Sequence, residues 1–332
     1  MPVEILSLKP YLKSEIWGGQ KLKSIYGGAG MTDIAEAWVL SAHPKGPSVI
    51  AEGKWQGNGL PFALGVMGPQ NTGYYGSFPV LIKFIDACRD LSIQVHPDDA
   101  FAREYENDSG KTECWYILSA EPGAQIIYGL RDELTKEEFI AAAHSGEIEE
   151  HVNRVKVKAG DIIPIPSGTI HAICAGITLC EIQQSSDVTY RIYDYKRPGK
   201  DGKPRDLHVE KAALVSDLSS AETPDFSVGA PVSEGDMTVS RLVHNEFFLT
   251  DLVYLGGERV CSTPERSIRS EELKRSFVSY VILEGEGAVS CDSAECRCDR
   301  MKFSKGGSIY IPACCGEYLL EGDFKAVRTA LT

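Results

Sequence analysis

Several features that define other classes of protein are missing from this sequence. No apolar run reaches the roughly 18 residues that a membrane-spanning helix requires, and the first residues, Met-Pro-Val-Glu-Ile, contain neither the basic segment nor the apolar core of a secretion signal. Lys and Arg number 34 against 47 Asp and Glu, giving a formal net charge of −13, which argues against an extended nucleic-acid surface. We therefore expect a cytoplasmic protein without membrane or nucleic-acid partners, in which an anionic substrate needs a local basic cluster.

The ten cysteines form no familiar ligand pattern. The sequence has no CxxC pair, and Cys296 with Cys298 and Cys314 with Cys315 are too closely spaced for a zinc ribbon. Disulfides belong mainly to short secreted chains, so we interpret the cysteines as core and surface thiols. Adventitious metal binding by Cys291, Cys296 and Cys298 is the weaker interpretation.

Strand patterns predominate along the chain. Residues 34–41 alternate between apolar and polar, and residues 78–86 form an apolar run broken by one lysine; both patterns are typical of strands. Residues 57–77 are rich in Gly, Pro and Asn, which predicts a loop. The sequence therefore indicates a mainly β protein.

Helical patterns occupy three short stretches, at about residues 98–110, 132–152 and 206–217. Thr135 is the expected N-cap of the second helix, because its hydroxyl can accept a hydrogen bond from the first turn. A segment rich in Ser, Pro and Asp at 217–235 is the best candidate for a boundary. We therefore predict two domains, 1–235 and 236–332.

Four residues from separate parts of the chain offer a set of metal ligands. Gln94 and His96 lie two apart in an alternating run, so a strand points both side chains to the same face. Glu113 opens the next β-like run, and His171 closes a pattern of the form Gly160-x5-Pro166-x-Gly168-x2-His171. An amide oxygen, two imidazoles and a carboxylate suit Zn²⁺, Fe²⁺ or Mn²⁺. Taken singly, His96 and His171 would be ordinary histidines of a β-barrel and Glu113 a solvated charge at the edge of a sheet. Taken together, they favour a metal site.

The chain also contains an internal repeat. Two pairs of segments resemble each other: 116–124 with 280–288, and 160–166 with 306–312. Aligning the copies puts Phe277 opposite Glu113. It likewise puts Glu317 opposite His171. The second copy therefore retains the scaffold without the ligands, and we expect one metal-binding barrel and one structural barrel.

The ligand spacing resembles the two conserved motifs of cupins, in which these residues converge on one metal inside a small β-barrel. From Trp17 to its C-terminus the chain resembles the short bacterial form of class I mannose-6-phosphate isomerase. The resemblance is strongest in four segments: Leu91-Ser-Ile-Gln-Val-His-Pro-Asp-Asp, Gly110-Lys-Thr-Glu-Cys-Trp-Tyr, Pro166-Ser-Gly-Thr-Ile-His-Ala and Thr189-Tyr-Arg-Ile-Tyr-Asp-Tyr. It implies two cupin (jelly-roll) barrels with short helical insertions: a catalytic one in 1–235 and a degenerate one, without metal ligands, in 236–332.

The resemblance also implies three groups of site residues. The ligands of one zinc ion per chain are Gln94, His96, Glu113 and His171. The catalytic candidates are Arg191, Lys111 and Glu181. The contacts to a substrate phosphate are Lys83 and Ser92, completed by Lys196 or Arg197.

Elementary chemistry leaves alternatives for several of these roles. Lys83 lies in an apolar strand, where a lysine needs a partner or a cavity unless it extends along the strand edge to water. Arg191 is too basic to be a general base, so it either stabilises an enediolate or forms a salt bridge with a nearby aspartate. The proton carrier is Glu181 if burial raises its pKa, Lys111 if the zinc and the arginine lower its pKa, or hydroxide on the metal.

Together these residues predict an aldose–ketose isomerase that interconverts mannose 6-phosphate and fructose 6-phosphate through a cis-enediol. The alternatives are a non-catalytic cupin that binds a sugar phosphate and a non-haem iron cupin dioxygenase. A dioxygenase leaves Lys83, Ser92 and Lys111 unexplained, and a binding protein does not explain a complete ligand set in one of two repeats. The sequence carries no signal for the oligomeric state.

Overall fold

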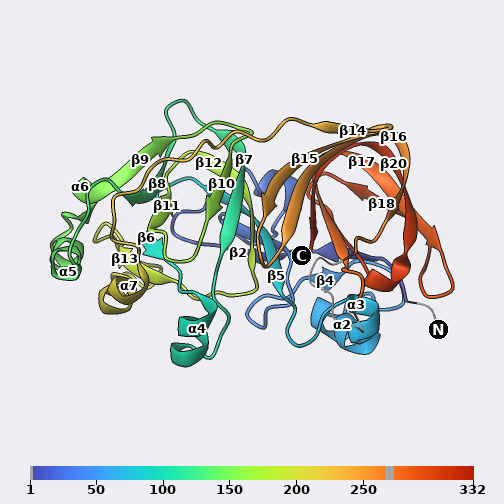
Figure 1. Ribbon diagram of the computed structural model, residues 1–332, viewed down its shortest axis with the longest axis horizontal. Coiled ribbons are helices and arrows are strands. Elements are labelled where there is room, and N and C mark those ends of the chain that lie inside the picture. The colour runs from blue at the N-terminus through green and yellow to red at the C-terminus, as the bar shows by residue number, and fades with distance from the viewer. Residues whose placement is uncertain (1–2, 266–272) are drawn as a thin grey trace. The chain divides into compact units, whose positions relative to one another are not determined.

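The computed structural model describes residues 3–265 and 273–332 of the 332-residue chain. Strands predominate and the helices are short (Figure 1), so the protein is mainly β, as the sequence predicts. Within the described ranges, no helix combines the length and the apolar character needed to cross a membrane.

The chain divides into two compact units, each assembled from segments that are distant in sequence. The central unit comprises Leu12–Ala37 and Lys83–Ser227; the terminal unit comprises Met1–Tyr11, Trp38–Ile82 and Val228–Thr332. The chain thus leaves the central unit after Ser227, close to the predicted limit at 235. The predicted first domain is not continuous, however, because Leu6–Lys9 pairs with Ser308–Ile311 and carries the N-terminal segment into the terminal unit.

Two sheets run through the central unit, and the strands of the second are paired antiparallel throughout. In spatial order, the first contains β10 Ile162–Ile165, β7 Glu113–Ala120, β12 Ile177–Gln184, β5 Val80–Ala87, β3 Glu36–Leu40 and β2 Tyr11–Lys13. The second contains β13 Tyr190–Tyr193, β6 Ile93–Val95, β11 His171–Ile173, β8 Gln125–Leu130 and β9 Val152–Lys156.

The main core of the central unit lies between these two sheets. Trp115 and Ile117 from β7 pack in one buried cluster with Ile126 from β8 and Ile173 from β11. Because one sheet contributes the first pair and the other sheet the second pair, their inner faces enclose the core, as in a sandwich or closed barrel.

Short helices add a second buried cluster to the central unit. The helices of this unit are α1 Lys23–Tyr26, α4 Asp99–Tyr105, α5 Lys136–Ser145, α6 Ile148–His151 and α7 Val209–Val215, and the cluster is built from α5, α6 and α7. Phe139 of α5 and Val209 of α7 pack with Val95 and Ile127 of the second sheet. Thr135 is the N-cap of α5, as predicted, and completes a capping box in which Thr135 and Glu138 satisfy each other's backbone N–H groups.

One sheet spans the terminal unit, in the order β14-β15-β16-β20-β17-β19-β1-β4, with β18 paired to β17. Its strands are β1 Leu6–Lys9, β4 Val49–Ile50, β14 Val232–Glu234, β15 Met237–His244, β16 Leu249–Ser262, β17 Val278–Asp292, β18 Arg297–Ser304, β19 Ser308–Ile311 and β20 Glu317–Ala330. The helices are α2 Leu60–Met67, α3 Pro69–Thr72 and the 3₁₀ turn η1 Ala313–Cys315.

The predicted loop at residues 57–77 is wrong, because α2 and α3 lie within it. Each helix begins with a proline in its first turn, where the missing N–H costs nothing. Leu60, Ala63, Leu64 and Met67 of α2 are buried, so packing stabilises a segment whose Gly and Pro content favours a loop.

The internal repeat has a matching pattern of strand pairing in the two units. β7 lies between β10 and β12, and β17 lies between β19 and β20. In the first copy Glu113 pairs with Ile165, and in the second Val278 pairs with Ile311. The counterpart of Glu113 is therefore Val278, one residue beyond the predicted Phe277, and it is equally unable to bind a metal.

Candidate metal centre

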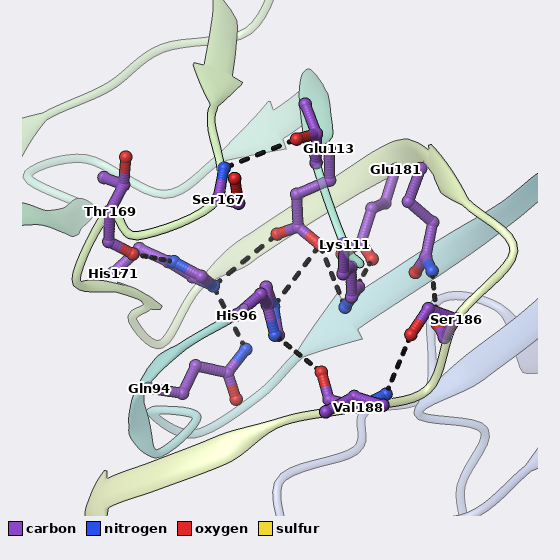
Figure 2. A network of polar contacts seen from close by, with 12 residues as sticks. Gln94, His96, Lys111, Glu113, Ser167, Thr169, His171, Glu181, Ser186 and Val188 are labelled. Carbon is purple, nitrogen blue, oxygen red and sulfur yellow. Dashed lines mark hydrogen bonds and ion pairs between the residues drawn. The ribbon is translucent and has the colours of Figure 1, made fainter. Parts of the chain in front are cut away.

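Three buried side chains meet where three strands begin or end. His96 follows β6 directly, Glu113 opens β7 and His171 opens β11. Nε2 of His96 lies 3.6 Å from Oε2 of Glu113, and Nε2 of His171 lies 3.6 Å from Oε1 of the same carboxylate. Figure 2 shows both imidazoles turned toward this carboxylate. The three ligand atoms lie within 4.8 Å of one another, so three of the four predicted ligands are assembled.

Strand register brings Gln94, the fourth predicted ligand, to the same place. Gln94 pairs with His171 across β6 and β11, and its amide Nε2 lies 3.3 Å from Nε2 of His171. Gly168 permits the turn that leads into β11, because its φ of +86° lies in the left-handed region. Coordination of a metal by the Gln94 oxygen requires the amide to rotate, since its nitrogen faces the imidazole.

The second ring nitrogen of each histidine fixes its tautomer. Nδ1 of His96 lies 2.9 Å from the carbonyl oxygen of Val188, and Nδ1 of His171 lies 2.8 Å from that of Thr169. A carbonyl oxygen only accepts, so each Nδ1 carries the hydrogen and each Nε2 presents a lone pair to the carboxylate. This is the arrangement in which a histidine binds a metal while its other nitrogen is held by the protein.

Burial keeps both histidines in the form that binds metals. Burial, and then the charge of Lys111, lowers the pKa of His96 well below its usual range, and burial lowers the pKa of His171 to about 4. Both imidazoles are therefore neutral at neutral pH. In the part of the chain that the structure describes, the buried Nε2 of His96 makes no hydrogen bond, which a metal ion at this point would remedy. Two imidazoles and a carboxylate fit a catalytic metal with open positions.

A chain of alternating charges leads away from Glu113. We call Lys13, Glu36, Lys83, Glu181, Lys111 and Glu113 the charge row. Lys111 Nζ lies 2.9 Å from Glu113 Oε2 and 3.5 Å from Glu181 Oε1. Lys83 Nζ lies 3.0 Å from Glu181 Oε1 and 3.6 Å from Glu36 Oε2, and Lys13 Nζ lies 3.4 Å from Glu36 Oε1.

The charge row sets the protonation of its two central members. Burial alone would lower the pKa of Lys83, but Glu181 and then Glu36 outweigh burial and raise it, so Lys83 stays charged. Burial, and then the charge of Glu113, raises the pKa of Glu181, while Lys83 and Lys111 oppose the rise. Glu181 was expected to be the proton carrier if burial raises its pKa, and burial does raise it.

A cavity of about 240 Å³ lies beside the row within the central unit. Its lining includes five basic and four acidic side chains, so in a chain of net charge −13 it carries a local excess of positive charge. The predicted site residues that line it are Lys83, Ser92, Gln94, Lys111, Glu181 and Arg191.

Two arginines in the cavity wall stand close together. Nη1 of Arg191 donates to the carbonyl of Asp206 at 2.7 Å, and its buried Nε makes no hydrogen bond among the described residues. Burial, and then the charge of Arg205, lowers the pKa of Arg191. Arg205 donates to both carboxylate oxygens of Asp194 at 2.7 Å, whereas the Nε of Arg191 has no such acceptor, so an anion beside the two guanidinium groups is favoured at Arg191.

Two predicted phosphate contacts are held elsewhere by protein groups. Arg197 is not among the cavity residues; its guanidinium donates to Asp194 Oδ1 at 2.7 Å and to a backbone carbonyl. Lys196 Nζ donates to the carbonyl of Ser145. The sequence left open a salt bridge between Arg191 and an aspartate side chain. The hydrogen bond of Arg191 instead goes to a backbone carbonyl, that of Asp206.

Several cavity residues were missed in the sequence: Lys13, Glu36, Asp187, Thr189 and Arg205. Glu36 carried a usable signal, since an acid flanked by apolar residues in the predicted strand 34–41 is as costly to bury as Lys83. Arg205 carried none, because it lies in an irregular loop and reaches the cavity only through the fold.

Comparison with known proteins places this chain among close relatives. A family model of the type I phosphomannose isomerase catalytic domain matches residues 5–118. The chain is 36% identical over 337 residues to the mannose-6-phosphate isomerase ManA of Bacillus subtilis, with 100% of both chains covered. It is 32% identical over 332 residues to the mannose-6-phosphate isomerase of Streptococcus mutans, with 98% of both covered. The crystal structure of mannose 6-phosphate isomerase from Bacillus subtilis matches with a TM-score of 0.84 and 33% identity, covering 98% of this chain and 99% of that one.

Proposed function

Because the chain belongs to the type I mannose-6-phosphate isomerase family, we propose that it interconverts mannose 6-phosphate and fructose 6-phosphate by proton transfer between C1 and C2. The observation that carries this proposal is the buried His96–Glu113–His171 group, continued by the charge row along a cavity that contains two arginines. Such a site combines a place for a metal, a carboxyl with a raised pKa and positive charge for a phosphate.

We assign the metal to His96, Glu113 and His171, with the Gln94 oxygen as a fourth ligand, and we propose Zn²⁺, one ion per chain. The donor set of two imidazoles, a carboxylate and an amide is consistent with that ion. When bound, the ion supplies positive charge beside the sugar oxygens, where negative charge develops during isomerisation. Trp115 Nε1 donates to Glu113 Oε1 at 2.9 Å and would keep the carboxylate oriented.

We assign the proton transfer to Glu181. Its Oε1 accepts the proton from C2 of the aldose and returns it to C1, and the O2 proton moves to O1. Lys83 and Lys111 flank this oxygen at 3.0 and 3.5 Å, so they keep the carboxylate ionised and oriented before it takes up the proton. Lys111 also touches Glu113 and is the group that can hand a proton to a sugar oxygen on the metal side.

For the substrate phosphate we propose Arg205 and Arg191, with Ser92 as a hydrogen-bond donor. All three line the cavity. Arg205 is paired with Asp194 through its Nε and Nη2, so we assign its remaining Nη1 to the phosphate, and a dianion would relieve the repulsion between the two guanidinium groups. Lys83 is less suited to this task than the sequence suggested, because two carboxylates already hold its ammonium group. Arg191 would in addition stabilise charge on the enediolate.

The two units would then differ in task. We propose that the central unit is the catalytic cupin barrel and that the terminal unit is a degenerate cupin barrel with a structural role. The repeated strand pairing supports a common origin, and Val278 stands where the first copy has Glu113. The sequence alignment puts Glu317 opposite His171.

The deciding experiment is a coupled assay with mannose 6-phosphate before and after chelation, with metal content measured on the same samples. We expect chelation to abolish turnover and added Zn²⁺ to restore it. The His171→Ala variant should lose metal and activity, while His144→Ala, at an exposed histidine of α5, should lose neither. Full activity of metal-free His171→Ala contradicts the proposal. Fructose 6-phosphate binding without proton exchange at C2 would instead identify a binding protein, and oxygen uptake with Fe²⁺ a dioxygenase.

A further inference from the structure

A second group of potential metal ligands lies in the terminal unit, whereas the metal centre and the cavity described above belong to the central unit. Cys291 lies near the end of β17, Cys296 lies in the turn between β17 and β18, and Cys315 is the last residue of η1. Their sulfur atoms lie within 4.8 Å of one another. The sequence pointed to Cys298 as the third member, but the fold brings in Cys315 instead.

The three thiols are spaced for a shared ion. The sulfur atoms of Cys291 and Cys296 are 3.5 Å apart, whereas bonded sulfurs lie about 2.05 Å apart. Two thiolates that bind one zinc ion at about 2.3 Å in a tetrahedral arrangement lie about 3.8 Å apart. All ten cysteines are unbonded, and the observed spacing is close to that of a ligated pair.

The backbone holds these positions before any ion binds. Cys296 N donates to Ser293 Oγ at 3.0 Å, and Ser293 N donates to the carbonyl of Cys296 at 2.9 Å. Val3 brackets the same turn, because its N–H donates to Glu295 and its carbonyl accepts from Arg297. Cys315 N donates to the carbonyl of Pro312 at 3.0 Å. Ligands fixed in this way lose little entropy on binding.

The chemistry of the group favours a thiophilic divalent cation. Cys296 and Cys315 are at most 1% exposed and Cys291 is 8% exposed. A buried thiolate is costly without a counter-charge, and a bound divalent cation supplies that charge. Thiolates select zinc or monovalent copper. Three thiolates leave a net charge of −1 with Zn²⁺ but −2 with Cu⁺, so burial favours zinc.

We propose that Cys291, Cys296 and Cys315 form a second metal site, which holds one Zn²⁺ ion and ties the β17–β18 turn to η1. A water molecule takes the remaining position. Each thiol that binds gives up its proton to solvent, and no electrons are transferred. The ion has no part in isomerisation, since all three ligands lie in the terminal unit and none lines the catalytic cavity.

The first test compares zinc content across variants of the full-length chain, purified in reductant without chelator. Substitution of Cys291→Ser together with Cys315→Ser should remove one zinc ion per chain and leave kcat/KM for mannose 6-phosphate unchanged. Cys298→Ser is the matched control: it lies on the same hairpin, directs its sulfur to the carbonyl of Val289, and should retain the zinc. Equal zinc content in the double variant and wild type overturns the site.

The second test needs no variant in the cysteine group, so it holds even if the double variant fails to fold. Cadmium added to the reduced, metal-free wild-type chain should produce the ultraviolet charge-transfer band of a cadmium thiolate, saturating at one equivalent. The band should persist in His171→Ala, which separates this site from the proposed catalytic metal. Absence of the band, or peptide mapping that finds a disulfide between Cys291 and Cys296 in the protein purified in reductant, overturns the proposal.

Discussion

Replacement of Lys83 by methionine tests whether this lysine supports Glu181 or contacts the phosphate. Lys83 and Glu181 are both buried, and the nearest N–O distance is 3.0 Å. At an effective dielectric constant of 20, two unit charges at that distance attract by about 5.5 kcal/mol. Desolvation of both groups offsets part of this, and removing one member of a buried pair costs about 3–5 kcal/mol.

The structure places the cost of Lys83→Met at the low end of that range. Glu181 retains Lys111 at 3.5 Å, and Glu36 retains Lys13 at 3.4 Å, so neither carboxylate is left without a cation. We therefore expect the free energy of unfolding to fall by about 3 kcal/mol, measured by urea denaturation. Lys211→Met, at an exposed ion pair with Glu106, is the control and should cost about 1 kcal/mol or less.

The same variant should change the pH dependence of catalysis. Lys83 lowers the pKa of Glu181, so its removal raises that pKa further above the usual value. The base works when ionised, so activity on the acid side should disappear at a higher pH than in wild type. The acid limb of kcat/KM, followed in the coupled assay, measures this. A raised KM with an unmoved acid limb and unchanged stability would refute the reasoning and restore Lys83 as a phosphate contact.

Three further predictions concern other parts of the central unit. Trp115→Phe removes the hydrogen bond to Glu113 and should weaken metal affinity by about 10–100-fold, measured by competition with a chromophoric chelator; unchanged affinity would mean that the carboxylate is oriented by Lys111 alone. Arg205→Met should raise KM for mannose 6-phosphate by about tenfold, or about 1.4 kcal/mol, with little change in kcat, whereas a loss confined to kcat would contradict a phosphate contact. Thr135→Ala should lower the free energy of unfolding by about 1 kcal/mol through loss of the capping box, with activity retained.

Local rules were sufficient where the site depends on side-chain direction and turn chemistry. Gln94 and His96 share a face because strands repeat every two residues, and Gly168 marks a turn with positive φ. Lys83 was recognisable as a charge that needed a partner. These features depend on residues that are neighbours in the sequence, so they can be recognised without knowledge of the fold.

Features that depend on distant segments were not predictable in this way. Glu36 became the partner of Lys83 only through the pairing of distant strands. Arg197 and Arg205 both donate to Asp194, and the path of the loop decides that Arg205 and not Arg197 lines the cavity. Cys315 joined Cys291 and Cys296 for the same reason. Composition misled at residues 57–77, where burial of an apolar face overrides the preference of Gly and Pro for loops.

The alternation of lysine and glutamate beside the metal centre has a consequence for how such a protein can change. Because Lys83 and Lys111 each serve two carboxylates, a substitution at either position disturbs neighbours on both sides. Effects of changes within such an array are far from additive. Loss of Lys83 together with Glu36 should therefore be tolerated better than loss of Lys83 alone, so descendants of this sequence can be expected to remodel these positions in compensated pairs.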